Sequence, residues 1–228
     1  MGMPLGDDDS GRHLVPIVTV LFIVVNVLVF LVELSQGNIE RFFQMWSVVP
    51  AEYTRQTDMP PTIPLPFWST LFTSMFMHGG WLHLGGNMLY LWIFGDNVED
   101  AMGHVKYIVF YLLCGVAAAF AQIMVSPNST IPSLGASGAI SGVLAAYLVL
   151  FPRQKVRVLM MRQIVVMPAF IVIGFWILLQ FISGVGQISQ TEETGGVAYA
   201  AHIGGFLAGL ALVWVFRSRT RQPAQRIT

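Results

Sequence analysis

Six apolar runs follow one another along this chain of 228 residues, and no other feature constrains its fold as strongly. They extend over Val15 to Leu34, Phe67 to Phe94, Tyr107 to Val125, Ser137 to Phe151, Ile164 to Ile182 and Val197 to Phe216. A helix that spans a bilayer needs about 20 mostly apolar residues. The second run is broken at Met77-His-Gly-Gly-Trp81, so its helix is expected from about Trp81. The runs predict an all-α membrane protein, a bundle of six transmembrane helices whose fourth member is short.

The runs also set the domain organisation. No internal repeat occurs, so residues 15–217 are expected to form one domain between a cytoplasmic N-terminal tail, residues 1–14, and a cytoplasmic C-terminal tail, residues 218–228. The tails are polar and are read as solvated. The first run lacks a signal-peptide cleavage site and is read as a retained helix. The loop that follows it, residues 38–66, combines charges with aromatic residues, which favours an amphipathic loop at the headgroups.

The cations give an orientation. With six spans, both termini and the even connections lie on one side, which carries ten of the 12 Lys and Arg residues: Arg12, Lys106, Arg153, Lys155, Arg157, Arg162, Arg217, Arg219, Arg221 and Arg226. Only Arg41 and Arg55 fall on the other side. Cytoplasmic loops are enriched in Lys and Arg, so both termini are predicted to be cytoplasmic. A compact build without a targeting extension suggests a multi-pass protein of the plasma (cell) membrane.

Charge and cysteine content exclude some function classes. Lys and Arg equal Asp and Glu at 12 each, so no basic surplus exists for nucleic-acid phosphates, and nucleic acid is not expected as a partner. The single cysteine, Cys114, can form neither an internal disulfide nor a cysteine-rich zinc site.

Polar residues are predicted to gather at one depth of the bundle. His83 and Asn87 lie one turn apart on the second helix, Ser137 begins the fourth, and His202 lies in the first turns of the sixth. All three helices start on the outer side, so at ~1.5 Å per residue these groups fall within roughly the outer 10 Å. Polar groups inside a membrane are costly and mark functional sites. Taken singly, each could be a packing or helix-linking residue.

Small residues favour close contact between the fourth and sixth helices. Gly138 and Gly142 are four apart, as are Ala201, Gly205 and Gly209, and such spacing lets helix backbones approach in lipid. The contact would bring Ser137 near His202, as a nucleophile and its base require. The helix N-terminus at Ser137 could stabilise an oxyanion, with Asn87 and His83 as further donors. No acidic residue faces this group, so the base would act in a Ser-His dyad.

The ordered set of motifs resembles the rhomboid family of intramembrane serine proteases. The matching elements are His78-x4-His83-x3-Asn87, Val98-Glu99 with Gly103, Gly135-Ala-Ser137-Gly138, and Ala201-His202-Ile-Gly-Gly205. The resemblance covers residues 68 to 209. It implies a rhomboid-like bundle in which Ser137 is the nucleophile, His202 the general base, and Asn87, His83 and the Ser137 N–H the oxyanion hole. It also implies cleavage of single-span membrane proteins in the lipid bilayer without metal or cofactor. Residues 186–196 and the fifth helix would admit substrate and water.

The remaining motif residues are read as structural. His78 is expected to hold the first loop, and Glu99 to fix the second by hydrogen bonding, beside an exposed His104. Gly135, Gly138 and Gly205 are also read as structural, and Gly138 and Gly205 would allow close backbone packing.

Two departures from the family pattern bear on the site. Ser141 replaces the aromatic residue that many relatives carry four positions after the nucleophile, so another residue is expected to orient His202. Ser69 replaces an Arg frequent in the first loop. A catalytically silent relative that binds transmembrane helices is the main alternative function. A small transporter or channel is a second, but neither symmetric halves nor mid-span ionisable residues are seen.

Overall fold

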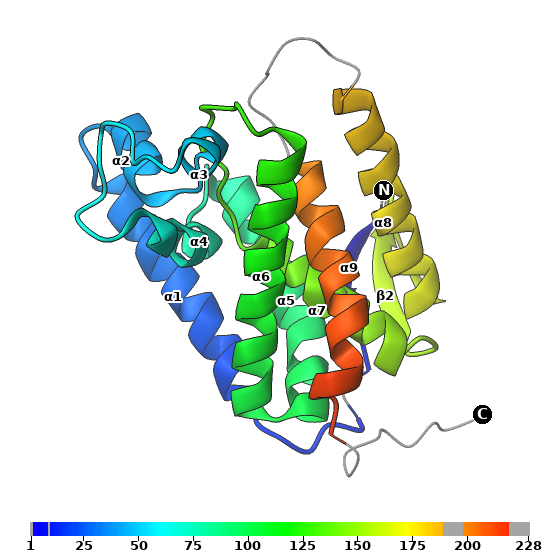
Figure 1. Ribbon diagram of the computed structural model, residues 1–228. Helices are drawn as coiled ribbons and strands as arrows, with labels where there is room; N and C mark the ends of the chain where they lie inside the picture. The colour runs from blue at the N-terminus through cyan, green and yellow to red at the C-terminus, as the bar shows by residue number, and fades with distance from the viewer. Residues whose placement is uncertain (1, 9, 189–197, 219–228) are drawn as a thin grey trace.

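The computed structural model describes residues 2–8, 10–188 and 198–218. Its frame is a bundle of long helices, one for each predicted run: α1 (Ile17–Leu34), α5 (Trp81–Met102), α6 (His104–Val125), α7 (Ser137–Leu150), α8 (Ala169–Ile188) and α9 (Tyr199–Phe216) (Figure 1). Of the expected cap over residues 186–196, residues 186–188 belong to the end of α8 and residues 189–196 lie outside the described residues. Most of the C-terminal tail does so too.

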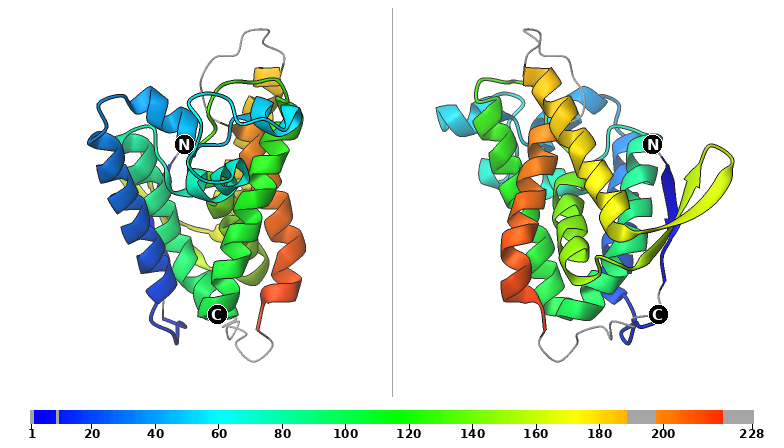
Figure 2. Two further views of the ribbon diagram at one scale, coloured as in Figure 1. Left: turned by 60° about the vertical axis from the view of Figure 1, so that its left-hand side comes forward. Right: turned by 90° about the vertical axis from the view of Figure 1, so that its right-hand side faces the viewer.

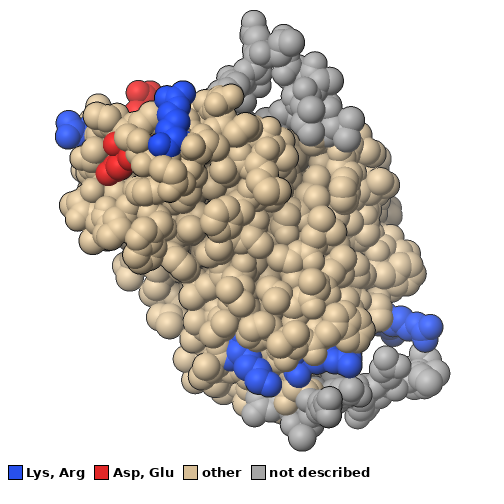
Figure 3. Space-filling model, viewed as in Figure 1, with Lys and Arg blue, Asp and Glu red and all other residues tan. Residues whose placement is uncertain are grey.

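An uncharged band crosses the face of the bundle that Figure 3 shows. Lys and Arg lie at both ends of this face and Asp and Glu at one end, with no such residue on the broad band between them. In the described part of the chain, α1, α6 and α9 are long and apolar enough to cross a membrane, and α7 and the first part of α8 are shorter apolar helices. These features are those of a membrane-embedded protein. The count of six crossings stays a prediction.

Helix α5 extends beyond its apolar run. The run ends at Phe94, but the helix continues to Met102 through Asp96, Glu99 and Asp100, all of them buried. Asp100 accepts hydrogen bonds from the backbone N–H groups of His13 and Leu14, at 3.1 and 2.7 Å. Carboxylates can remain inside the fold here because the chain that leads into α1 satisfies them.

The prediction of an all-α fold was wrong at one place. A three-stranded antiparallel sheet, in the order β1 (Met3–Gly6), β2 (Lys155–Met160), β3 (Gln163–Pro168), lies at the side of the bundle, where β1 contacts α5 and the other two strands contact α8 (Figure 2). Strand β2 alternates exposed Lys155 and Arg157 with buried Val156 and Val158, the period of a strand. The N-terminal tail therefore is not wholly solvated, because its first residues pair with β2.

The first loop is folded and tied to the rest. It contains α2 (Ile39–Trp46) and α3 (Pro50–Arg55), followed by the short helices η1 (Phe67–Ser69), α4 (Thr70–Thr73) and η2 (Ser74–Phe76). Val48 pairs with Ser133 through two backbone hydrogen bonds of 3.1 and 2.8 Å, and the Tyr53 hydroxyl lies 2.6 Å from that of Thr70. The loop thereby holds the segment that leads into α7. Its place at the headgroups stays a prediction.

Helix α7 lies at the centre of the bundle and contacts α5, α6, α8 and α9. Ala145, Ala146 and Tyr147 are completely buried. The predicted contact of this helix with α9 is confirmed, and its cause is the absence of side chains: a Cβ on Gly209 would lie 2.5 Å from the Gly142 carbonyl oxygen. Only glycines allow backbones this close. The N-terminus of α7 is therefore held at a fixed position inside the protein.

Candidate active site

Ser137 is the first residue of α7, and the turn before it depends on a glycine. Gly135 has φ +128°, a conformation that residues with a Cβ rarely adopt. Its N–H donates to the Ser74 carbonyl oxygen at 2.8 Å, which fixes the turn to η2. Ser137 is thus presented at a helix N-terminus, where backbone N–H groups lack intrahelical partners and the helix dipole favours negative charge.

Ser137 and His202 are in direct contact. The distance from His202 Nε2 to Ser137 Oγ is 2.7 Å, that of a hydrogen bond between a hydroxyl donor and an imidazole acceptor. His202 lies in the first turn of α9 and is 8% exposed. The approach again requires glycine, since a Cβ on Gly205 would lie only 2.0 Å from the Gly138 carbonyl oxygen. Gly138 and Gly205 therefore set the distance between the two helices that carry the pair.

His83 lies beside the same turn. Its Nδ1 accepts a hydrogen bond from the Gly79 N–H at 3.3 Å, so its proton is on Nε2 and that atom is a donor. A Cβ built on Gly135 would lie 2.8 Å from His83 Nε2 and 3.5 Å from Ser137 Oγ. His83 Nε2 and the Ser137 hydroxyl therefore both lie beside the position that a Cβ of residue 135 would occupy.

Asn87 lies one turn further along α5. It is 8% exposed, and its Nδ2 has no hydrogen-bond partner among the described residues. A buried amide donor without a partner is costly and rare, so it is available to a ligand or an intermediate.

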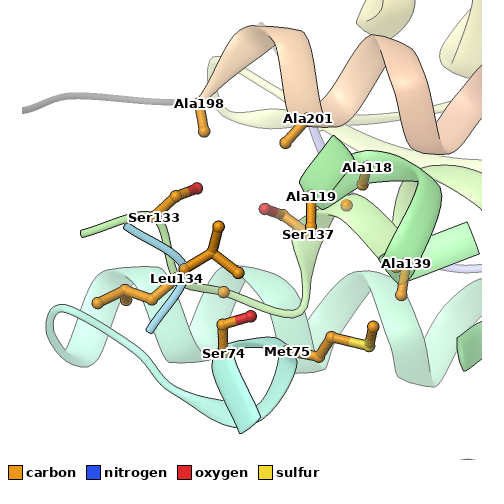
Figure 4. Close-up of a pocket in the computed structure, with 14 residues that line it drawn as sticks. Ser74, Met75, Ala118, Ala119, Ser133, Leu134, Ser137, Ala139, Ala198 and Ala201 are labelled. Atoms are coloured by element: carbon orange, nitrogen blue, oxygen red, sulfur yellow. The ribbon is translucent and has the colours of Figure 1, made fainter. Parts of the chain in front are cut away.

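A small cavity adjoins Ser137. Its volume is about 30 Å³, enough for a water molecule or two, and most of its lining consists of small residues. Figure 4 shows the Ser133 and Ser137 side chains pointing toward one another across it, below Ala201 of α9 and Ala198, which precedes that helix. Water next to the half-buried Ser137 hydroxyl is what a hydrolytic reaction inside a membrane protein requires.

Sequence reasoning missed two residues that contact His202. Gln180 Oε1 lies 2.7 Å from His202 Nδ1, and the Trp176 ring packs on the imidazole at a centroid distance of 5.8 Å and an interplanar angle of 37°. Both come from α8 and are one turn apart. Ser141 does not replace the missing aromatic contact, because its hydroxyl donates to the Ser137 carbonyl oxygen at 2.6 Å. The signal in the sequence was an amide in the middle of an apolar run.

Glu99 is the most heavily bonded of the residues read as structural. Its carboxylate accepts from the Val18 and Thr19 N–H groups at 2.9 and 2.8 Å and from the Thr19 hydroxyl at 2.7 Å. It also lies 2.6 Å from Nδ1 of His104, which begins α6. Glu99 thus fixes the α5–α6 junction, as expected for the second loop, and in addition the N-terminus of α1.

His78 lies in the break before α5 and is 1% exposed. Its backbone N–H donates to the Glu33 carboxylate at the end of α1, at 3.1 Å, and its ring packs edge-on against His83 at 5.0 Å. Burial, with the nearby His83, lowers the pKa of His78 to about 3. His78 therefore connects α1 to the start of α5 as a neutral ring.

No metal cluster is found in the part of the chain that the structure describes.

Comparison with known proteins shows which family this chain is similar to. Residues 66–219 match the rhomboid domain. The chain is 32% identical over 198 residues to rhomboid protease GluP of Bacillus subtilis, covering 86% of this chain and 35% of that protein. It is 30% identical over 151 residues to rhomboid-like protein 11, chloroplastic, of Arabidopsis thaliana (66% and 53%). It is 28% identical over 161 residues to rhomboid protein 1, mitochondrial, of Saccharomyces cerevisiae (69% and 44%).

The chain spans between about a third and about half of the length of these relatives. The matched segment contains Ser137, His202 and the two residues of α8 that contact His202, and it covers more than half of the chain. The chain belongs to the rhomboid family.

Proposed function

We propose that this protein is an intramembrane serine protease that hydrolyses peptide bonds in or near the transmembrane segments of single-span membrane proteins. The observation that carries the proposal is the 2.7 Å distance between His202 Nε2 and Ser137 Oγ inside an otherwise apolar bundle. A nucleophile and a base within hydrogen-bond reach are the minimum for covalent hydrolysis.

The reaction begins with attack of Ser137 Oγ on the scissile carbonyl carbon, while His202 Nε2 takes the hydroxyl proton. The carbonyl oxygen becomes an oxyanion. His83 Nε2–H, the Asn87 amide and the Ser137 N–H serve as its donors, and of these Asn87 is buried and Ser137 half-buried. Donors that are already in place where charge develops stabilise the transition state. Asn87 Nδ2 has no hydrogen-bond partner among the residues that the structure describes, and this supports the role, since the oxyanion would supply an acceptor.

The intermediate then collapses. The bond from carbon to nitrogen breaks, and His202 returns its proton to the leaving amine, which leaves an acyl ester on Ser137. Water attacks the ester carbon, His202 takes a proton from that water, and the proton passes to Ser137 Oγ as the ester bond breaks. The cavity beside Ser137 supplies the position for this water. No metal or cofactor takes part in these steps.

The decisive experiment uses purified protein in proteoliposomes with a model single-span substrate. We expect Ser137→Ala and His202→Ala to abolish cleavage and labelling by a fluorophosphonate probe, while Ser35→Ala, which removes an exposed hydroxyl at the end of α1, leaves both unchanged. Cleavage that survives Ser137→Ala would refute the dyad. Substrate capture without cleavage by the unchanged protein would instead favour the silent, helix-binding relative.

The proposal includes the setting of the site. Six helices cross the plasma membrane with both termini in the cytoplasm, and the amphipathic first loop lies at the outer headgroups. The distribution of Lys and Arg supports this orientation. In intact cells, an impermeant maleimide should label a cysteine placed at Ser35 but not one placed at Arg153, both of which are exposed positions. The reverse labelling would overturn the orientation and leave the dyad untouched.

A further inference from the structure

We propose that Gln180 is a positioning residue that fixes the ring orientation and the tautomer of His202, so that the site works as a chain of Ser137, His202 and Gln180. The inference rests on the proposed protease function. It concerns how the base is held.

The first support is the geometry of the imidazole. His202 has two ring nitrogens, and both are engaged at 2.7 Å, Nε2 by Ser137 Oγ and Nδ1 by Gln180 Oε1. Ser137 belongs to α7 and Gln180 to α8, so two different helices hold the ring from opposite edges. In the described part of the chain, these are the two hydrogen bonds of the His202 side chain.

The second support is the chemistry of the tautomer. A neutral imidazole carries one proton, and only the nitrogen without it can accept the proton of the serine. An amide carbonyl at Nδ1 requires the proton on Nδ1, which leaves the lone pair on Nε2 facing Ser137 Oγ. When His202 takes up the serine proton, the Nδ1–H···O bond gains a charged donor and becomes stronger. Gln180 therefore stabilises the protonated base more than the resting one.

The third support is the packing around the ring. Trp176, one turn before Gln180 on α8, lies against one side of the imidazole, and Tyr199 of α9 meets it edge-on at 6.4 Å. The titratable groups facing His202 are Tyr199 on its own helix and His83 on α5. No described carboxylate bonds to it, so the amide of Gln180 takes the orienting place that an acidic residue has in a Ser-His-Asp triad.

Gln180 could instead serve only as a structural link between α8 and α9 through the same hydrogen bond to His202. This alternative predicts different results for the variants. Loss of a structural link lowers the melting temperature and the amount of folded protein, while each folded molecule keeps its rate. Loss of a positioning residue lowers the rate of the folded molecule, and the rate recovers when a different acceptor is supplied at Nδ1.

The test compares Gln180→Met, of similar size but without a carbonyl acceptor, with Gln180→Glu, which keeps an acceptor. Leu178→Ala is the matched control, because Leu178 is on the same helix and 52% exposed. For each protein, kcat and KM for a single-span substrate, the rate of Ser137 labelling by a fluorophosphonate, and the melting temperature are measured across pH.

We expect Gln180→Met to lower kcat and the labelling rate by about tenfold at unchanged KM, the effect of one hydrogen bond. Gln180→Glu should restore the labelling rate and move the acidic limb of its pH profile to higher pH, because a carboxylate favours the protonated imidazole. Leu178→Ala should match the unchanged protein.

Two results would overturn the inference: wild-type kcat and labelling in Gln180→Met, or a loss that the folded fraction alone accounts for. Failure of the underlying function is recognised separately. In that case Ser137→Ala would fail to abolish cleavage, or the unchanged protein would not cleave at all, whatever the state of Gln180.

Discussion

Gly205→Ala tests whether the helix contact sets the geometry of the site. The added Cβ would lie 2.0 Å from the Gly138 carbonyl oxygen, whereas real Cβ contacts essentially never fall below 3.0 Å. The backbone cannot yield like a flexible side chain, so α9 must withdraw from α7 by about 1 Å. His202 lies three residues away on the same face of α9. Its contact with Ser137 would lengthen from 2.7 to about 3.7 Å, beyond hydrogen-bond range.

The expected loss follows from that displacement. A misplacement of 1 Å in a catalytic group costs on the order of 100-fold in rate, so kcat/KM should fall by about two orders of magnitude. Overpacking costs about 1–3 kcal/mol, which in a chain of this size lowers the melting temperature by roughly 2–12 °C. Cleavage of a single-span substrate in proteoliposomes and thermal unfolding in detergent measure the two effects.

Gly174→Ala is the matched control. Gly174 is also a helical glycine, but a Cβ there would meet nothing within 4 Å. Alanine in its place should leave cleavage unchanged. It should raise stability slightly, because alanine lowers the conformational entropy of the unfolded chain. If folded Gly205→Ala cleaves at the wild-type rate, close packing of α7 and α9 is not what holds the pair together.

Three further predictions concern single side chains. Asn87→Ala should lower kcat by about 100-fold at unchanged KM and melting temperature, because Nδ2 has no described partner to lose, and a matching loss of stability would refute the oxyanion role. Glu99→Gln should lower the melting temperature in detergent, because an amide cannot accept all the bonds that the carboxylate receives from α1, and an unchanged value would contradict this. His78 has an unfolded pKa of 6.5 and a folded pKa of about 3, so its contribution to stability is present above pH 6.5 and is lost as pH falls toward 3, by about 2 kcal/mol at pH 5. Melting curves of wild type and His78→Gln across pH should diverge accordingly, and parallel curves would refute the assignment.

The sequence could predict the helices of the bundle and the convergence of Ser137 with His202, because both follow from regular spacing. Apolar runs of helical length locate the helices, and glycines four apart on two runs indicate which of them touch. The sequence could not predict that α5 continues beyond Phe94. Asp96, Glu99 and Asp100 follow the apolar run, and nothing local shows that the residues leading into α1 supply their hydrogen bonds.

Long-range contacts account for what was missed. Strand β2 alternates over six residues, too few to separate from the apolar run that follows, and its partner β1 lies about 150 positions earlier. Gln180 was passed over for a related reason. An amide in an apolar helix signals that a partner exists, but the sequence does not say which helix provides it.

The carboxylate of Glu99 imposes an order on biosynthesis. It accepts from the Val18 N–H, 81 positions earlier in the chain. At roughly 5–20 residues per second, the ribosome delivers that acceptor about 4 to 16 s after the amide it serves. The start of the first helix must therefore wait for its anchor throughout the synthesis of the first loop and α5.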